Sequence, residues 1–481
     1  MKKYIFLLLL ILPSLGIHAQ THTFQKTYGG NQWELGQSVC QLTDGGYITA
    51  GRTSSYGHGE EDAYIIRMDA NGDTLWTEEL GGVLNDYGYT IRCVPEGYLI
   101  SGHTESFGHG DCDGWFFKID TTGKLIWMNT YGTPQSEVTS SFNFTNDNGY
   151  VLIGYHGTES DSTGWVYMVK TNAAGDTSWA KYYGTAVSSM GYYVCQTPDS
   201  GFAFTGYSAG RAYKNMDMIL GKTDKDGNLQ WMKKFGGDSD DVAYSMQLTP
   251  EGGYIIAGYT HSFGAGDDDG YVIKTDALGN VIWAKTYGGP QQDRFNHIEQ
   301  TFDGGYIMSG QTKSYGAGGA DVYVVKIDSA GNQQWMQTYG NKFDQVNGSI
   351  KQCADSGYII IGSSNKIDTG FGDYDELLIK TDKLGNMVTG IPGIVQNSYE
   401  IKPYPNPFLQ STAFNIPIGL LVNKVSLEIY NITGKKIFTR ENISNENTIT
   451  VERGNLAPGM YFYKFICNDK LVSTGKLILQ D

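Results

Sequence analysis

Large aromatic residues recur along most of this chain at a nearly constant interval. Six of them are tryptophans: Trp76, Trp127, Trp179, Trp231, Trp283 and Trp335. Neighbouring members of this tryptophan ladder are 51 or 52 residues apart, and one more step in each direction reaches Phe24 and Met387. A fixed period of this length is typical of propellers and other repeat arrays, whereas one turn of a β-helix uses far fewer residues. The ladder therefore predicts a repeat protein.

The best-formed copy of the repeat covers residues 236–287. Its four predicted strands are 244–248, 254–259, 271–275 and 281–287. Tight turns follow the first and third strands, while longer and more variable segments make the other connections. Four strands joined in this way form one propeller blade. Because long connections carry function more often than tight turns do, the face with the long loops is the candidate binding face.

Three further positions recur together with the ladder. A Tyr or Phe with Gly four residues later occurs in all seven copies, as in Tyr254 and Gly258. A basic residue such as Lys274 precedes the ladder position, and an Asp or Asn such as Asp276 stands two residues after the basic one. Positions that recur in every copy serve the scaffold rather than one active site, so we interpret them as structural.

The two ends of the array predict how it closes. Residues 23–29 match the fourth strand of a blade but have no blade of their own, whereas the seventh copy lacks a good fourth strand after residue 386. The N-terminal strand therefore completes the last blade and covers an open sheet edge. The predicted fold is all-β, with a seven-bladed β-propeller over residues 20–387 built from four-stranded repeats of ~52 residues. We expect each ladder residue to bury against a neighbouring blade.

Composition agrees with an all-β chain. Hydrophobic residues make up 40% and aromatic residues 13%, and 64 Gly stand against only 12 Pro, which favours many short strands joined by tight turns. The formal net charge of −16 opposes binding to nucleic acid and to anionic membranes. We therefore expect no nucleic-acid partner.

Residues 1–19 have the pattern of a secretory signal peptide. Lys2 and Lys3 precede an apolar run from Tyr4 to Leu15, and Ala19 ends the segment. The run is too short to span a membrane as a helix, and no later segment approaches eighteen apolar residues. The sequence thus predicts an exported protein without a transmembrane segment.

The repeat stops after residue 387, where a linker over 388–402 leads into a region of different composition. Alternating apolar residues, as in Val425, Leu427 and Ile429, predict a small β-sandwich over 403–481. Four ordered motifs lie within it: Tyr404-Pro405-Asn406-Pro407-Phe408, Ile429-Tyr430-Asn431, Leu456-Ala457-Pro458-Gly459-Met460-Tyr461 and Gly475-Lys476-Leu477-Ile478.

These motifs resemble the C-terminal sorting domain of the type IX secretion system of Bacteroidetes. The resemblance implies an exported Bacteroidetes protein that passes through the periplasm and engages the type IX secretion machinery through 403–481. It also implies that the domain is usually cleaved off, which leaves the cargo secreted or attached to the outer surface of the outer membrane. The chain ends in Gln480-Asp481, whereas members of the family often end in a basic residue. This difference concerns the cleavage of the domain rather than its role as a secretion signal.

A column of acidic residues marks the candidate ligand site. Six residues after the Tyr of the fourth strand, five of the seven copies carry an acid: Glu34, Asp86, Glu137, Asp241 and Asp293. The last copy has Asp344 one residue earlier, and Arg294 beside Asp293 is the clearest break in the repeat. Such a column would place a ring of carboxylates near the axial channel, suited to a cation or a cationic ligand. The alternative is that each carboxylate caps a loop by accepting backbone N–H bonds.

A second acidic column opens the third strand in six of the seven copies, as in Asp113 and Asp269. Near-universal recurrence again favours a structural hydrogen bond. The runs 111–114 and 267–270 suggest calcium, but neither has the full spacing or the distal Glu of an EF-hand loop. His58 and His109 occupy matching loop positions, which leaves a shared metal site as an alternative. We expect no cofactor, with calcium as the alternative to test.

The chain has no GxSxG, HExxH or nucleotide-binding loop. We therefore expect a secreted or cell-surface binding or adhesion module for extracellular glycan or protein, by analogy with what such folds do. The alternative is a hydrolase or lyase acting on polysaccharide, with carboxylates on the long-loop face. A third hypothesis is a structural component of a surface layer.

Overall fold

The computed structural model describes residues 22–157, 164–184, 188–210, 215–365, 374–387, 401–416, 425–432, 435–440, 448–467 and 470–480. Every regular element of these residues is a β-strand, so the all-β class is confirmed. No helix of the described residues is long and apolar enough to cross a membrane. The chain divides into two units, Met1–Met387 and Val388–Asp481. The predicted signal peptide lies outside the described residues, as does most of the predicted linker.

The first unit consists of antiparallel groups of four strands, and six of these groups are consecutive in sequence. The first three are β2 (Glu34–Gln41), β3 (Tyr47–Thr53), β4 (Asp62–Met68), β5 (Thr74–Leu80); β6 (Asp86–Val94), β7 (Gly97–Thr104), β8 (Asp113–Ile119), β9 (Leu125–Tyr131); and β10 (Ser136–Phe144), β11 (Tyr150–Gly157), β12 (Gly164–Thr171), β13 (Thr177–Tyr183). The next three are β14 (Ser188–Gln196), β15 (Phe202–Ala209), β16 (Asp217–Thr223), β17 (Leu229–Phe235); β18 (Asp241–Leu248), β19 (Tyr254–Thr260), β20 (Asp269–Thr275), β21 (Val281–Tyr287); and β22 (Asp293–Gln300), β23 (Tyr306–Thr312), β24 (Asp321–Ile327), β25 (Gln333–Tyr339). One parallel bridge, between Gly164 and Ser188, joins the third group to the fourth.

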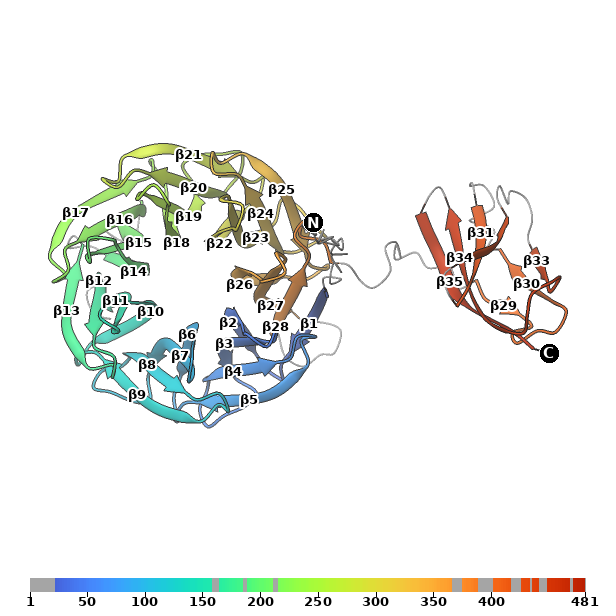
Figure 1. The fold of residues 1–481 in the computed structure, drawn as a ribbon. Coiled ribbons are helices and arrows are strands. Elements are labelled where there is room, and N and C mark those ends of the chain that lie inside the picture. The colour runs from blue at the N-terminus through green and yellow to red at the C-terminus, as the bar shows by residue number, and fades with distance from the viewer. Residues whose placement is uncertain are drawn as a thin grey trace, which may run out of the picture. The chain divides into compact units, whose positions relative to one another are not determined.

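Burial changes from strand to strand within each group. In the group β18–β21 every residue of β19 and β20 is buried, while β21 exposes Val281, Ile282 and Ala284 and buries only Tyr287. Figure 1 shows the reason: the groups surround a common centre, with β2, β6, β10, β14, β18, β22 and β26 innermost. The two middle strands are covered by neighbouring groups on both faces, and they accordingly read as continuous apolar runs such as Tyr254–Ala257.

The remaining group contains both ends of the first unit. It has the order β1 (Phe24–Tyr28), β28 (Tyr374–Thr381), β27 (Tyr358–Asn365), β26 (Gln345–Gln352). The N-terminal strand β1 pairs antiparallel with β28, with Phe24 opposite Lys380. The Phe24 ring also packs against Gly72 in the turn between β4 and β5, and the Tyr28 hydroxyl donates to the Gly72 carbonyl at 2.6 Å. The outermost strand of this group therefore contacts the first group in the chain.

The same contact repeats around the first unit. Each ladder residue lies against the turn glycine of the next group, in the pairs Trp76–Gly123, Trp127–Gly175, Trp179–Gly227, Trp231–Gly279, Trp283–Gly331 and Trp335–Gly385. A tyrosine four residues later often donates to the carbonyl of that glycine, as Tyr287 does to Gly331 at 2.7 Å. The turn glycines have positive φ, for example +79° at Gly331, and a side chain there would meet the indole ring. The indoles are half-buried rather than fully buried, because one face of the outermost strand stays in solvent.

The second unit is built from two sheets, as the predicted β-sandwich requires. One contains β29 (Pro403–Tyr404), β30 (Ser411–Asn415) and β33 (Thr448–Glu452); the other contains β32 (Lys436–Arg440), β31 (Val425–Asn431), β34 (Gly459–Cys467) and β35 (Lys470–Leu479). Inward-facing residues of both sheets, among them Phe414, Leu427 and Phe465, form one apolar core. This core is separate from those of the first unit.

The motif residues of the second unit hold its first segment to its last strand. The Asn406 side chain accepts the N–H of Ile478 and donates to the carbonyl of Lys476, both at 2.8 Å. Phe408 is buried in the core. The Pro405 carbonyl accepts a hydrogen bond from the Thr412 hydroxyl, and the Tyr461 hydroxyl donates to the Ala457 carbonyl. Tyr404 has an exposed ring, and β34 begins at Gly459. Pro407 follows Asn406 directly.

Candidate functional site

Each innermost strand of the first unit contains a β-bulge at the same place. In β18 the pairing with β19 jumps from Ala243 to Ser245, so Tyr244 is left without a partner. The residues skipped in the seven innermost strands are Gln37, Tyr89, Ser140, Tyr192, Tyr244, Asn296 and, in the last strand, Gly348 with Ser349. We call these residues the bulge belt. A bulge re-aims its extra side chain and ends regular pairing locally, which is why bulges are frequent beside binding sites.

The recurring glycine of the second strand is the partner of the bulge. A Cβ atom on Gly258 would overlap the carbonyl oxygen of Val242, two residues before Tyr244. The same overlap with the innermost strand occurs at Gly51, Gly102, Gly154, Gly206 and Gly310. The bulge therefore requires a residue without a side chain opposite it. This explains why the glycine column recurs in every copy.

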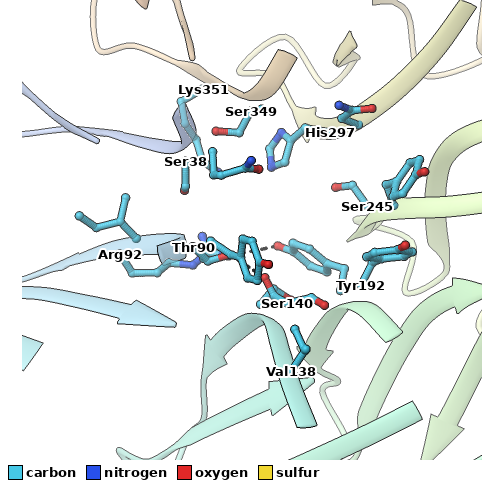
Figure 2. A pocket seen from close by; sticks show the side chains of 18 of the residues that line it. Ser38, Thr90, Arg92, Val138, Ser140, Tyr192, Ser245, His297, Ser349 and Lys351 are labelled. Carbon is cyan, nitrogen blue, oxygen red and sulfur yellow. Dashed lines mark hydrogen bonds between the residues drawn. The ribbon is translucent and has the colours of Figure 1, made fainter. Parts of the chain in front are cut away.

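The bulge belt surrounds a cavity of about 470 Å³ that we call the axial pocket. All members of the belt line it, together with neighbours on the same strands such as Arg92, His297 and Lys351. Figure 2 shows these side chains pointing toward a shared space from strands that surround it. Since the lining comes from all seven innermost strands, the pocket lies at the centre of the ring. Strands rather than the long loops supply its lining.

Tyrosines form an aromatic part of the lining. The Tyr192 and Tyr244 rings lie with their centroids 4.8 Å apart, and Tyr244 contacts Tyr259 at 6.0 Å. Burial raises the pKa of Tyr192 well above its ordinary value and also raises that of Tyr244. Their hydroxyls are therefore neutral at physiological pH and can both donate and accept a hydrogen bond.

Cationic side chains form another part of the lining. Arg294 stacks on Tyr259, with 4.3 Å between the guanidinium and the ring centroid, and it pairs with the fully buried Asp268. Lys351 pairs with Glu299 at 2.5 Å. Burial, and then the charges of Lys351 and Arg92, hold the pKa of His297 well below its ordinary value, so this imidazole is neutral.

Several polar atoms of the lining have no hydrogen-bond partner within the described residues. They are the hydroxyls of Ser140, Ser141 and Ser349, the Nε atom of Arg92 and the Nδ1 atom of His297. Buried polar atoms in folded proteins are normally paired, and an unpaired group destabilises the fold unless water or a ligand satisfies it. Unmet hydrogen-bonding capacity therefore lies close to the axial pocket.

The predicted acidic column lies outside the lining of the axial pocket. Glu34, Asp86, Glu137, Asp241 and Asp293 are fully buried, and each accepts the backbone N–H four residues earlier, at 2.7–2.9 Å. Asp344 accepts the Ala320 N–H at 2.8 Å. None of these six acids is among the described residues that line the axial pocket, whereas Arg294 is. Their contacts are those of the loop-capping alternative.

The second acidic column also caps loops. Asp113 accepts the backbone N–H groups of His109 and Gly110, and Asp62 does the same for His58 and Gly59. The two matched histidines thus contribute backbone rather than imidazole to these contacts. Within the described residues, no group of three or more His, Cys, Asp and Glu side chains could hold a metal ion. A calcium requirement stays a prediction to test.

The bulge belt was not predicted from the sequence. Its signal is the position three residues after the acidic column, where three copies have Tyr and the others have Gln, Ser, Asn and Gly. Small residues stand beside it in most copies. A variable position inside an otherwise periodic strand is where a repeat protein differs from copy to copy. The invariant glycine opposite it was the second signal, since an interior strand glycine often marks a bulge.

Comparison with known proteins identifies a family for the second unit. Residues 402–480 match the family model of the secretion system C-terminal sorting domain. The match supports the sorting-domain prediction over 403–481 and, with it, an exported protein that interacts with secretion machinery and reaches the outer surface.

Sequence comparison finds a distant relative. Regulatory protein FlaEY of Caulobacter vibrioides (strain ATCC 19089 / CIP 103742 / CB 15) is 24% identical over 170 residues, which cover 31% of this chain and 18% of FlaEY. The chain therefore spans under a fifth of that relative's length.

Solved structures with a similar chain course include a putative 6-phosphogluconolactonase of Bacteroides fragilis NCTC 9343, with 14% identity, 72% of this chain, 98% of that one and a TM-score of 0.44. Sqt1 from Chaetomium thermophilum has 10% identity, 72% and 85% coverage and a TM-score of 0.42. At these scores the likeness carries no functional argument.

Proposed function

We propose that this protein is an exported binding module in which a seven-bladed β-propeller holds an extracellular ligand, with glycan as the leading class and protein as the other. The protein passes through the periplasm, the sorting domain then directs it across the outer membrane, and the mature module works in the medium or on the cell surface. Support for the blade count comes from the four-stranded groups around one centre and from the pairing of β1 with β28. Support for export comes from the sorting-domain match.

The observation that carries the proposal is the chemistry of the axial pocket. A sugar ring presents apolar C–H faces and a rim of hydroxyls, so it is recognised by aromatic rings together with polar side chains. The pocket offers Tyr89, Tyr192 and Tyr244 beside seryl, amide and imidazole groups. Its volume of about 470 Å³ falls in the range of small-molecule sites, which suits a short stretch of a glycan chain.

A polysaccharide hydrolase is the less favoured alternative. Most glycoside hydrolases use two carboxyl groups on either side of the scissile bond, one as general acid and the other as nucleophile or base. Among the described residues that line the axial pocket there is no Asp or Glu. The neighbouring Glu299 and Asp268 are already paired with Lys351 and Arg294.

The decisive experiment is a binding screen of the purified chain against an array of extracellular glycans and matrix proteins, followed by titration calorimetry on each hit. Replacing Tyr192 with Ala should weaken binding about two- to tenfold, since aromatic contacts contribute about 0.5–1.5 kcal/mol beyond the area that they bury. Tyr182→Ala is the matched control, because Tyr182 lies 45% exposed on the outermost strand β13, away from the pocket.

Three results would count against the proposal. Turnover of a bound glycan, detected as new reducing ends, would favour the hydrolase or lyase. Equal losses of affinity in the Tyr192 and Tyr182 variants would move the site away from the pocket. Failure of every glycan and protein on the array to bind would leave a surface-layer component as the better hypothesis.

A further inference from the structure

One position beside the bulge belt links each group of strands to the next. It lies six residues after the acidic column and is occupied by Cys40, Arg92, Asn143, Cys195, Gln247, Glu299 and Lys351. Three of its members donate to a backbone carbonyl of the following group, in the pairs Cys40–Ile91, Asn143–Val194 and Gln247–Ile298. Glu299 instead accepts from both Lys351 and the backbone N–H of Gln352 in the following group. We call this the linking position.

Arg92 departs from this pattern. Its guanidinium reaches Tyr193, on β14, with 3.4 Å between the Nη2 atom and the hydroxyl oxygen, and its Nε atom is buried without a partner. Within the described residues it forms no ion pair. The charges of Glu299 and Cys40 act on Arg92 from nearby, but Glu299 forms its ion pair with Lys351.

Arg294, the other arginine of the axial pocket, differs from Arg92 because it has a counter-ion. Arg294 has Asp268 as its counter-ion, and outside the pocket Arg52 pairs with Glu61 at 3.1 Å. A guanidinium has five N–H donors and keeps its charge at any physiological pH. Leaving it unpaired in a partly buried site is unfavourable unless an anion or water completes its hydrogen bonds.

The groups around Arg92 could complete the recognition of an anion. Ser140, Ser349 and His297 line the same pocket, and each has a buried polar atom without a partner. Lys351 adds a second cation, offset by its pairing with Glu299. Figure 2 shows Arg92, Lys351, Ser349 and His297 around the same space. Among the described residues of the lining there is no carboxylate, and the nearby Glu299, whose charge acts on Arg92, is paired with Lys351.

We propose that Arg92 forms the anchor of a subsite for the carboxylate of an acidic sugar, with Ser349 and His297 as neighbouring donors and the tyrosines of the bulge belt against the sugar ring. The inference rests on the proposed function and names the ligand class. A carboxylate matches the guanidinium fork with two parallel hydrogen bonds, which a neutral hydroxyl does not. The net charge of −16 disfavours polyanion binding over the surface as a whole, so recognition would be confined to this pocket.

A matched pair of probes tests the charge alone. The trisaccharide of galacturonic acid carries free carboxylates, and its methyl ester keeps the sugar rings but removes their charge. We expect the full chain to bind the acid about 10–100-fold more tightly than the ester, as hydrogen bonds to charged groups of this kind warrant. A sulfated galactose trisaccharide tests the other source of anionic sugars.

Variants assign the preference to Arg92. Arg92→Met keeps the length of the side chain and should reduce affinity for the acid about 10–100-fold while leaving that for the ester within about twofold. Arg92→Lys should restore part of the preference, and Arg52→Met, which also removes one cation, should leave it intact. Thermal unfolding of each variant separates a lost subsite from a lost fold.

The outcomes distinguish this inference from the function on which it rests. Equal binding of acid and ester, unchanged in Arg92→Met, would overturn the carboxylate subsite and leave the glycan-binding function standing. Preference for the sulfated probe over the acid would replace the carboxylate with a sulfate as the anion. Absence of binding by all three probes, in a chain that binds a neutral glycan from the array, would also overturn the subsite.

Discussion

Asp241 and Tyr244 lie three residues apart on β18 and differ in nearly every structural respect. Asp241 belongs to a column that recurs in the array, is fully buried, and accepts the Gly237 N–H at 2.8 Å. Tyr244 belongs to a position that changes from copy to copy, has no pairing partner on β19, and faces the axial pocket. The comparison shows that in this repeat the periodic residues build the ring and the aperiodic ones build the site. The same division holds on β22, between Asp293 and Asn296.

The largest effect is expected from replacing the glycine opposite the bulge, which tests whether this periodic residue is needed for the fold. In Gly258→Ala the new methyl group would overlap the Val242 carbonyl, and the backbone would have to move. We expect a loss of about 3–5 kcal/mol in the free energy of unfolding, measured by urea denaturation. Gly252→Ala is the control, because Gly252 has a positive φ of +86° but open space around it; only about 1 kcal/mol should be lost there. Equal losses would show that the bulge does not require the glycine.

A second test compares a residue of the acidic column with a residue of the bulge belt on the same strand, β22. Asp293→Ala removes the acceptor for the Gly289 N–H and for the hydroxyls of Thr312 and Ser314, all around a buried site. We expect it to cost about 2–4 kcal/mol of stability. Asn296→Ala, in the bulge belt, should cost less than about 1 kcal/mol, as for a substitution at a partly exposed position, yet alter ligand affinity. A stable Asp293→Ala variant with impaired binding would return the acidic column to the role of a ligand site.

A third test concerns the group that contains both chain ends. The third residue of its strand β28 is the fully buried Glu376, while the equivalent position in the other groups is uncharged: Ala63, Gly114, Val166, Met218, Gly270 and Val322. Burial, with a contribution from the nearby Glu34 charge, raises the pKa of Glu376 from 4.5 to about 8. Between these values the folded protein holds a proton that the unfolded chain has released.

Stability from Glu376 is therefore fully present below about pH 4.5 and is lost as the pH rises to about 8. Across pH 5 to 7.5 the loss should reach about 2–3 kcal/mol, at no more than about 1.4 kcal/mol for each pH unit. Urea denaturation of wild type and Glu376→Gln over this range measures it, and the variant should show the flatter profile. Parallel profiles would mean that Glu376 is ionised in the folded state throughout.

The smallest expected effect concerns calcium. Because the acidic columns already accept backbone N–H groups, we expect a chelator to leave the melting temperature within about 1 °C of the value with calcium present. Differential scanning calorimetry with and without excess calcium is the measurement. A rise of several degrees on adding calcium would reveal a metal site that the columns create together.

The periodic part of the molecule could be predicted from the sequence because local hydrogen bonds and packing repeat with it. The strand ranges, the tight turns at residues such as Asp276 and the ladder contacts with turn glycines all follow from the same residues in each copy. The pairing of β1 with β28 follows from two incomplete ends that complement each other. In the second unit, four short motifs were enough to predict the domain, because each fixes a turn or a strand end.

The site could not be predicted by the same reasoning. Whether a carboxylate faces a loop or the axis depends on which way a strand turns after residue 241 or its equivalents, and the repeat pattern is the same in both cases. The position of Arg92 beside Tyr193 depends on the radius of the ring, which brings residues 101 positions apart in the sequence into contact. Distances of that kind are set by the assembled ring and not by any one copy.

The bulge has a consequence for how the protein can change. Tyr244 and its counterparts take no part in the regular pairing between strands, and the glycine that tolerates the bulge lies on another strand. Substitutions in the belt can therefore accumulate while the hydrogen bonds within each group of strands stay the same. Each residue of the bulge belt can therefore be replaced without changing the pairing of the strands around it. A library that varies only those positions should yield folded proteins with new ligands, much as variable loops do on an antibody domain.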